Sequence, residues 1–260
     1  MEDRWIRFEG IRNARTLDGL RSEDGRRVRP GLLLRTGKLC EATDSDVAAL
    51  AEQWHLSLVI DLRTTPERQQ EPDRAVPGAE RKELPVFDDR VIGVTHEKDK
   101  ESEKRTLPPP PDMERVYRRM VFDPYCRENL GRSTAAVLEH DFTKGSVLWH
   151  CSEGKDRCGL LAMTVLTALG VDRETIMADY MLTNVFSAPK AEQFYQELLA
   201  KGRSPEDAAG VRRGLRAEES YMEAAFAAIE ELCGDLPHYL TEGLGIPEQT
   251  IRDFRERMLI

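Results

Sequence analysis

The sequence lacks any hydrophobic run that approaches the ~20 residues a membrane-spanning helix needs. Its first ten residues, MEDRWIRFEG, begin with charge and contain no apolar segment of the kind that directs secretion. We therefore expect a protein without stable membrane insertion. The cytoplasm is the expected location, and secretion by a route that needs no signal peptide stays open.

The sequence also lacks an excess of basic residues. It has 38 Lys and Arg residues against 47 Asp and Glu residues among 260, which gives a net charge of -9. Proteins that bind nucleic acid usually carry a basic surface, so this charge argues against nucleic acid as a partner. It does not argue against a small anionic substrate, because a local pocket can be positive on an acidic protein.

Cysteine is scarce and shows no disulfide or metal-binding pattern. Five cysteines are an odd number, and their irregular spacing is not typical of a disulfide framework. No Cys-x-x-Cys pair or histidine-rich cluster indicates zinc, so no metal site is expected. We expect free thiols, most of them packing residues: Cys40, Cys126, Cys151, Cys158 and Cys233.

Short apolar runs alternate with helical patterns in the first half of the chain, and helical patterns alone follow. This order predicts an α/β fold, a single domain over residues 1–260 with a central, mainly parallel sheet flanked by helices and a mostly helical carboxyl-terminal half. The strand candidates are residues 32–35, 56–61, 81–87 (the weakest) and 146–150. The helix candidates are a segment capped by Thr43 or Asp44, residues 113–121 and 127–140, a buried helix from 157 or 158 to Gly170, and residues 172–186, 190–200, 217–233 and 247–258.

One segment has too few apolar residues to bury much surface. Between Phe87 and about Asp112 stand the runs HEKDKESEKRT and LPPPP. We interpret this segment as a tolerated surface insertion or as a lid over an active site. Such a lid would extend over residues 88–125 at most.

A seven-residue loop joins a strand to a helix in an order that binds anions. The apolar strand SVLWH ends at His150, the loop 151–157 contains Gly154, and a long apolar helix follows. Main-chain N–H groups point into such a loop, and the helix dipole favours negative charge there. The segment therefore predicts an anion site.

Cys151 and Arg157 stand at the two ends of this loop. The amino end of a helix and neighbouring cations lower the pKa of a cysteine, ordinarily ~8.5, by several units, so Cys151 is a candidate nucleophile that is ionised at neutral pH. The planar guanidinium of Arg157 can bind two phosphate oxygens at once, which a lysine cannot do. These residue types predict phosphoryl chemistry.

Residues 150–157, HCSEGKDR, resemble the signature loop of the protein tyrosine phosphatase superfamily. More narrowly, the loop is similar to that of the bacterial tyrosine and lipid phosphatases of family 3 type, which carry Lys-Asp before the arginine. Other blocks resemble the same family: NARTLDG from residue 13, GRRVRPGLLLRTGKL from residue 25, VIDLRTTPE from residue 59 and DYMLTN from residue 179.

The resemblance implies a two-step reaction that uses no metal or cofactor. Cys151 attacks phosphorus to form a phosphocysteine, and water then releases inorganic phosphate. The loop amides and Arg157 hold the phosphate oxygens as charge shifts in the transition state. In that family the loop aspartate, here Asp156, is the general acid for the leaving oxygen, and Asp88 or Asp89 is the alternative acid.

The other residues of the loop are implied as substrate-binding groups: His150, Ser152, Glu153, Gly154 and Lys155. Lys155 adds positive charge at the pocket rim, which in the resembling enzymes goes with accepting phosphoinositides as well as phosphotyrosine. The alternative for Lys155 is a lysine that faces solvent. His150 is expected to order the loop through hydrogen bonds rather than to act as a base.

Three further residues are candidate modulators of the site. Asp61 and Arg63 follow a buried strand, where a structural ion pair is the simpler interpretation. Cys158 stands where the family usually has serine or threonine, whose hydroxyl helps the sulfur of Cys151 to leave. A thiol is a weaker donor, which predicts a slow second step. Cys158 could also form a reversible disulfide with Cys151.

Three other functions compete with a phosphotyrosine phosphatase. The complete loop argues against an idle phosphate-binding module, and its Lys-Asp-Arg ending argues against a rhodanese-type sulfurtransferase. Glu153 makes the loop less basic than an inositol-polyphosphate phosphatase would need. The sequence leaves open whether the phosphorylated substrate is a protein, on tyrosine or on serine and threonine, or a phosphoinositide.

Overall fold

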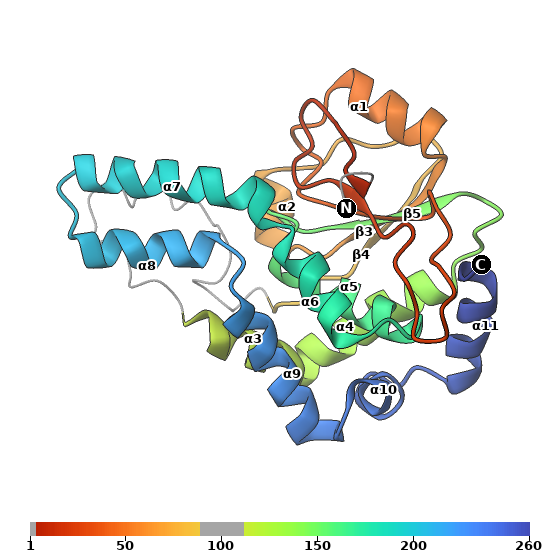
Figure 1. The fold of residues 1–260 in the computed structure, drawn as a ribbon. Helices are drawn as coiled ribbons and strands as arrows, with labels where there is room; N and C mark the ends of the chain where they lie inside the picture. The colour runs from red at the N-terminus through yellow and green to blue at the C-terminus, as the bar shows by residue number, and fades with distance from the viewer. Residues whose placement is uncertain (1–3, 89–111) are drawn as a thin grey trace.

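The structure, a computed structural model, describes residues 4–88 and 112–260. Its centre is a five-stranded sheet in the order β1-β2-β5-β3-β4 (Figure 1). The three pairings β2–β5, β5–β3 and β3–β4 are parallel, and β1 pairs with β2 antiparallel. The predicted mainly parallel sheet is therefore confirmed. The strands are β1 (Arg15–Thr16), β2 (Leu33–Thr36), β3 (Leu56–Asp61), β4 (Glu80–Glu83) and β5 (Ser146–His150).

The two central strands β3 and β5 have the bounds that their apolar runs predicted. Both are buried on both faces, which is why their sequences are almost continuously apolar. Successive side chains of β5 enter different cores: Val147 and Trp149 pack on one face of the sheet and Leu148 on the other. The sheet therefore separates two hydrophobic clusters.

The edge strand β4 differs from its prediction. It ends at Glu83 instead of continuing to Phe87. Its partner β3 ends at Asp61, and Pro85 has no N–H to donate to a continued ladder.

Helices cover both faces of the sheet and make up most of the chain after β5 (Figure 1). The central helix α5 (Asp156–Ala168) is buried at every residue from Arg157 on, which confirms the predicted buried helix. The other helices are α1 (Asp44–Ala48) with its π-helical extension η2 (Ala49–Gln53), α2 (Thr65–Gln70), α3 (Met113–Phe122), α4 (Pro124–Leu138), α6 (Arg173–Met181), α7 (Asn184–Ala200), α8 (Pro205–Leu215), α9 (Glu219–Cys233), α10 (Leu236–His238) with η4 (Tyr239–Gly243), and α11 (Glu248–Met258).

The region after α5 shows two departures from the predicted helices. The single helix expected over residues 172–186 is two helices, because α6 ends at Met181 and α7 begins at Asn184. The break lies where Thr183 accepts a hydrogen bond from Arg15, far away in sequence. Helix α8, capped by Ser204, was not predicted, since it carries few large apolar side chains and only Ala208 of its residues is buried.

Helices α7 and α8 pack chiefly against each other and extend away from the sheet (Figure 1, left). The side chains of Val185 and Phe194 on α7 are 58% and 43% exposed, unusual values for large apolar groups. In these two helices only Ala191, Leu198 and Ala208 are buried.

Part of the predicted lid is instead a core element. Helix α3 buries Met113, Val116, Tyr117, Met120 and Val121 and packs along α9. Residues 113–122, which fall within the range of the predicted lid, therefore form part of the core. The remainder of the prediction falls on residues 89–111, which lie outside the described residues. Among the helices in the described part of the chain, none is both long and apolar enough to cross a membrane.

Candidate active site

The predicted anion loop connects β5 to α5 and depends on one glycine. Gly154 has φ +67°, a backbone conformation that residues with a side chain rarely adopt. A Cβ at this position would lie 2.6 Å from the carbonyl carbon and oxygen of Thr36 in the neighbouring strand β2. Only glycine lets the loop turn this close to the sheet.

The outer carbonyl groups of the loop are bound by side chains from the amino-terminal region. Asn13 Nδ2 donates to the carbonyl oxygens of Glu153 and Gly154, each at 3.0 Å. Arg35 Nη2 donates to the carbonyl oxygen of Gly154 at 3.1 Å. In a trans peptide the carbonyl and the following N–H point in opposite directions, so binding these carbonyls outward turns amides inward. In the described part of the chain, no acceptor binds the amides of residues 152–155, which suits an anion nest.

Behind these groups lies a buried cluster of one carboxylate and three arginines. Asp179 accepts from Arg4 and Arg35 at 2.7 Å each and from Arg15 at 3.4 Å. Arg15 also donates to Asn13 Oδ1 at 2.6 Å. Burial alone would raise the pKa of Asp179, but the three guanidinium charges hold it well below its ordinary range. The cluster joins the NARTLDG, LLLRTG and DYMLTN blocks, which explains why all three accompany the loop.

The structure places Cys151 at the start of the loop, 2% exposed, with an unusually acidic thiol. A hydrogen bond from the Cys158 thiol is the largest cause, burial opposes it, and the charge of Arg157 adds to it. Together they lower the pKa of Cys151 from 9.0 to about 5. Cys151 is therefore a thiolate at neutral pH.

Cys158 shows the opposite behaviour. Burial and the neighbouring Cys151 raise the pKa of the Cys158 thiol well above 9.0, so it keeps its proton and can donate. Its Sγ also lies 3.7 Å from the carbonyl oxygen of Thr36 and 4.0 Å from that of Trp149. The Cys158 thiol, a weak donor, therefore lies near the Cys151 sulfur and two carbonyl oxygens, all of which can accept a hydrogen bond from it.

The Arg157 guanidinium is bound by a carboxylate that sequence reasoning missed. Glu67 on α2 accepts from Arg157 Nη1 at 2.6 Å and from Nη2 at 2.8 Å. This pair uses one edge of the guanidinium, and no acceptor in residues 4–88 or 112–260 binds the Nε atom on its other edge. Burial would raise the pKa of Glu67, but Arg157 outweighs it and lowers that pKa from 4.5 to about 2. The pattern Thr64-x-x-Glu67 signalled only a capping box, which is also present.

The side chains of the middle of the loop are bound to protein groups. Ser152 Oγ donates to Glu67 Oε1, and Glu153 forms an ion pair with Lys190 of α7 at 2.9 Å. Lys155 does not face solvent. It is 3% exposed, and its Nζ donates to the carbonyl oxygens of Gly214 at 2.6 Å and Arg216 at 3.0 Å, at the carboxyl end of α8.

Asp156, the first residue of α5, accepts a hydrogen bond from Tyr117 Oη at 2.7 Å on its Oδ1 atom. Its side chain is 22% exposed, and Lys155 Nζ lies 3.5 Å from the same oxygen. The alternative acid Asp88 follows Phe87, whose ring lies 5.7 Å from the Arg157 guanidinium, and the other alternative, Asp89, lies outside the described residues.

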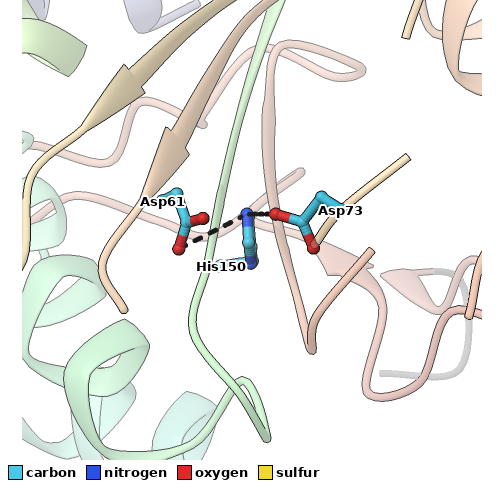
Figure 2. A group of neighbouring side chains, drawn as sticks. All are labelled: Asp61, Asp73 and His150. Atoms are coloured by element: carbon cyan, nitrogen blue, oxygen red, sulfur yellow. Dashed lines mark ion pairs between the residues drawn. The ribbon is translucent and has the colours of Figure 1, made fainter. Parts of the chain in front are cut away.

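His150, which directly precedes Cys151, forms a buried group with Asp61 and Asp73. Figure 2 shows the imidazole of His150 between the two carboxylates, with Nε2 3.1 Å from Asp73 and 3.9 Å from Asp61. Burial would lower the pKa of His150, but the two carboxylates raise it. Arg63 and Arg81 each bind Asp61, at 2.9 and 2.7 Å, and both also reach Asp73.

This group satisfies the spacing of a metal site but not its charge. A divalent cation bound to these carboxylates would contact two guanidinium groups, and repulsion between like charges disfavours it. The observed contacts are those of a structural ion network. Asp61 and Arg63 form the ion pair that the sequence predicted, buried rather than at the surface.

Comparison with known proteins agrees with the geometry. A Cupriavidus necator protein is 29% identical over 250 residues, which cover 95% of this chain and 86% of that protein. The triple specificity protein phosphatase PtpB of Mycobacterium tuberculosis is 29% identical over 262 residues, 89% of this chain and 92% of PtpB. A tyrosine-protein phosphatase of Nostoc commune is 27% identical over 229 residues, 86% of this chain and 73% of that protein.

The model of a family described as the tyrosine phosphatase family matches residues 6–260. This range contains the anion loop and every block that builds its scaffold. The chain therefore belongs to the tyrosine phosphatase family, as its loop sequence predicted, and it is a protein-tyrosine phosphatase.

Proposed function

We propose that the chain hydrolyses phosphate monoesters through a phosphocysteine intermediate on Cys151. The observation that carries the proposal is the thiolate of Cys151, with a pKa of about 5, at the start of a loop whose amides are free to bind an anion. A strong nucleophile and an oxyanion site thus lie side by side.

The reaction proceeds in two steps, and groups of this chain together with water account for every bond and proton in each. In the first step the Cys151 sulfur bonds to phosphorus, the bond to the leaving oxygen breaks, and Asp156 gives that oxygen a proton. In the second step water attacks phosphorus, its proton goes to Asp156, and the thiolate leaves with release of inorganic phosphate. Arg157, oriented by Glu67, binds phosphate oxygens through its Nε edge, and Gly154 keeps the amides directed inward.

Phosphotyrosine is the substrate that the surroundings favour. A phosphoinositide carries further phosphate groups and needs unpaired cations near the loop. Among residues 4–88 and 112–260, the cations nearest the loop are already paired: Lys38 with Glu41 and Glu71, Lys190 with Glu153, and Lys155 with the carbonyls of α8. Its relative PtpB is named a triple specificity phosphatase, so phosphoserine, phosphothreonine and phosphoinositides are the comparison substrates in the test.

The test is hydrolysis of para-nitrophenyl phosphate by the wild type and by Cys151→Ser, followed by rates on phosphopeptides and phosphoinositides. We expect activity that disappears in Cys151→Ser, a phosphorylated Cys151 after rapid quench, and the highest kcat/KM on phosphotyrosine peptides. Activity that survives in Cys151→Ser would refute the mechanism. A wild type that binds phosphate but hydrolyses nothing would indicate the idle binding module. A higher kcat/KM on inositol phosphates than on phosphotyrosine peptides would refute phosphotyrosine as the preferred substrate.

Cys158 is proposed to protect the nucleophile from irreversible oxidation. Peroxide oxidises the Cys151 thiolate to a sulfenic acid, the Cys158 thiol attacks that sulfur, and water leaves as the disulfide forms. The proximity that lets Cys158 donate to Cys151 supports this step. Peptide mapping after mild peroxide should give a 151–158 disulfide, and sulfinic acid on Cys151 without any disulfide would reject it.

We also propose that residues 1–260 fold as one phosphatase domain that works in the cytoplasm. One hydrophobic cluster contains Leu17 near the amino end, Trp149 of β5 and Met258 near the carboxyl end, which supports a single folding unit. A single cooperative unfolding transition and recovery in the cytoplasmic fraction are expected. Two separate transitions, or recovery elsewhere, would contradict the proposal.

A further inference from the structure

Asp156 accepts a hydrogen bond from one buried tyrosine hydroxyl, which in turn contacts a second, and the two tyrosines come from two other helices. Tyr117 on α3 donates to Asp156 Oδ1 at 2.7 Å, and the hydroxyl of Tyr180 on α6 lies 2.9 Å from that of Tyr117. The two tyrosines are 0% and 1% exposed. Three helices thus converge on one carboxyl group beside the nucleophile.

Packing fixes both rings, so the hydroxyl of Tyr117 has little freedom to turn away. The rings of Tyr117 and Tyr180 meet edge to face with centroids 6.1 Å apart. A phenol has one proton, so when Tyr117 gives it to Asp156, the proton of Tyr180 completes the contact between the hydroxyls. Burial raises the pKa of both tyrosines well above 10.0, which keeps them protonated donors.

We propose that the Tyr117–Tyr180 pair positions the general acid of the reaction. Tyr117 occupies Oδ1 of Asp156, which keeps the transferable proton on Oδ2, an atom that accepts no hydrogen bond from the described residues. The same hydrogen bond stabilises the carboxylate that remains after proton transfer and holds it for the second step. The inference rests on the proposed role of Asp156 and adds two positioning residues to it.

Other charged and titratable groups also face Asp156. Lys155 Nζ, a positive charge, lies 3.5 Å from Oδ1, and the Cys151 thiolate is the negative charge nearby. Tyr221 on α9 belongs to the same aromatic group, with its ring centroid 5.9 Å from that of Tyr117. Its hydroxyl donates elsewhere, to the carbonyl oxygen of Arg213 at 3.1 Å. Tyr221→Phe is therefore a matched control for Tyr117→Phe.

The experiment measures kcat/KM on aryl phosphates whose leaving phenols range from acidic, such as 2,4-dinitrophenol, to weakly acidic, such as phenol. Weakly acidic phenols need the proton from the general acid and acidic ones do not. For Tyr117→Phe we expect a loss of about tenfold on phenyl phosphate, the size of one charge-assisted hydrogen bond, and less than about twofold on dinitrophenyl phosphate. Tyr221→Phe should follow the wild type throughout.

A pH profile gives a second readout that a merely structural role would not move. The basic limb of kcat/KM reports loss of the transferable proton. Without the Tyr117 hydroxyl the carboxylate is less stabilised, so this limb should move to higher pH by about one unit. If Tyr117→Phe folds poorly, the double variant Tyr117→Phe/Tyr180→Phe leaves no buried hydroxyl without a partner and should show the same signature.

Asp156→Asn separates failure of this inference from failure of the proposed acid. If Asp156→Asn loses no more activity on phenyl phosphate than on dinitrophenyl phosphate, Asp156 is not the general acid, and Asp88→Asn should be measured next. Asp156 keeps its role if Asp156→Asn loses much more activity on phenyl phosphate than on dinitrophenyl phosphate. If in addition Tyr117→Phe loses activity equally on all substrates, or behaves like Tyr221→Phe, the role of the tyrosine pair is overturned.

Discussion

The anion loop is held in different ways on two sides: the rear, which faces the amino-terminal region and the sheet, and the rim, which faces helices α7 and α8. At the rear, buried side chains of Asn13 and Arg35 bind its carbonyls, with Asp179 and its three arginines behind them. At the rim, Glu153 and Lys155 contact helices α7 and α8 through one partly exposed ion pair and two carbonyl oxygens. The rear therefore determines whether the loop forms at all, and the rim adjusts what approaches it.

The largest expected effect on stability comes from a substitution in the buried cluster at the rear of the loop. Asp179→Asn leaves three buried guanidinium groups without their counter-charge, which should lower the free energy of unfolding by about 3–5 kcal/mol. Denaturant unfolding measures this change. The control is Asp24→Asn, which removes a carboxylate from an exposed ion pair with Arg26 and should cost far less stability. Equal losses in the two variants would contradict the comparison of rear and surface.

The second effect concerns the orientation of Arg157. Glu67→Gln removes the charge that holds the guanidinium, and kcat/KM should fall about 10- to 100-fold, as for a charge-assisted hydrogen bond. The control Glu71→Gln, at the opposite end of the same helix and paired with Lys38 near the surface, should change kcat/KM little. An unchanged rate in Glu67→Gln would mean that the loop alone orients Arg157.

Glu67 also contributes to the pH dependence of stability. Its pKa falls from 4.5 in the unfolded chain to about 2 in the fold, so its contribution is present above pH 4.5 and is lost as the pH falls toward 2. The wild type should lose stability over this range faster than Glu67→Gln. Parallel curves for the two proteins would show that the pair has no net effect.

The third effect distinguishes the two cysteines. A slow second step gives an initial burst of the first product followed by a lower steady-state rate. Cys158→Ser supplies a better hydrogen-bond donor for the departing sulfur, so this steady-state rate should rise. Cys158→Ala removes the donor, which should raise the pKa of Cys151 and move the acid limb of kcat/KM upward from about pH 5. Equal burst and steady rates in the wild type would refute the slow second step, and an unmoved limb in Cys158→Ala would exclude Cys158 as the donor.

The smallest effect is expected at the rim. Lys190 and Glu153 are 40% and 35% exposed, so Lys190→Ala should change the free energy of unfolding by less than about 1 kcal/mol. It leaves Glu153 unpaired, so KM for anionic substrates should rise, more at low salt than at high salt. Glu153→Gln should lower KM, most for phosphoinositides. Changes of the same sign in both variants would contradict an electrostatic role for the rim.

Several features followed from local sequence because local physics decides them. The runs LSLVID and SVLWH are apolar at successive positions, which suits strands covered on both faces, and their bounds were predicted without error. Helix α8 was missed because it carries few large apolar side chains, and the break between α6 and α7 was missed because it lies where Thr183 contacts the distant Arg15. Lys155 was expected to offer its charge to the pocket or to solvent, whereas its amine is bound by carbonyl oxygens at the end of α8.

The sequence by itself determined where the anion loop lies and which cysteine and arginine stand at its ends, because seven consecutive residues between an apolar strand and an apolar helix are the pattern of an anion nest. Only the tertiary structure decided which groups serve that loop. Glu67 reaches Arg157, Tyr117 reaches Asp156 and Asp179 reaches Arg4 across 90, 39 and 175 positions, respectively. Ion pairs and hydrogen bonds between such distant residues depend on how the helices pack around the sheet, and no local pattern records that packing.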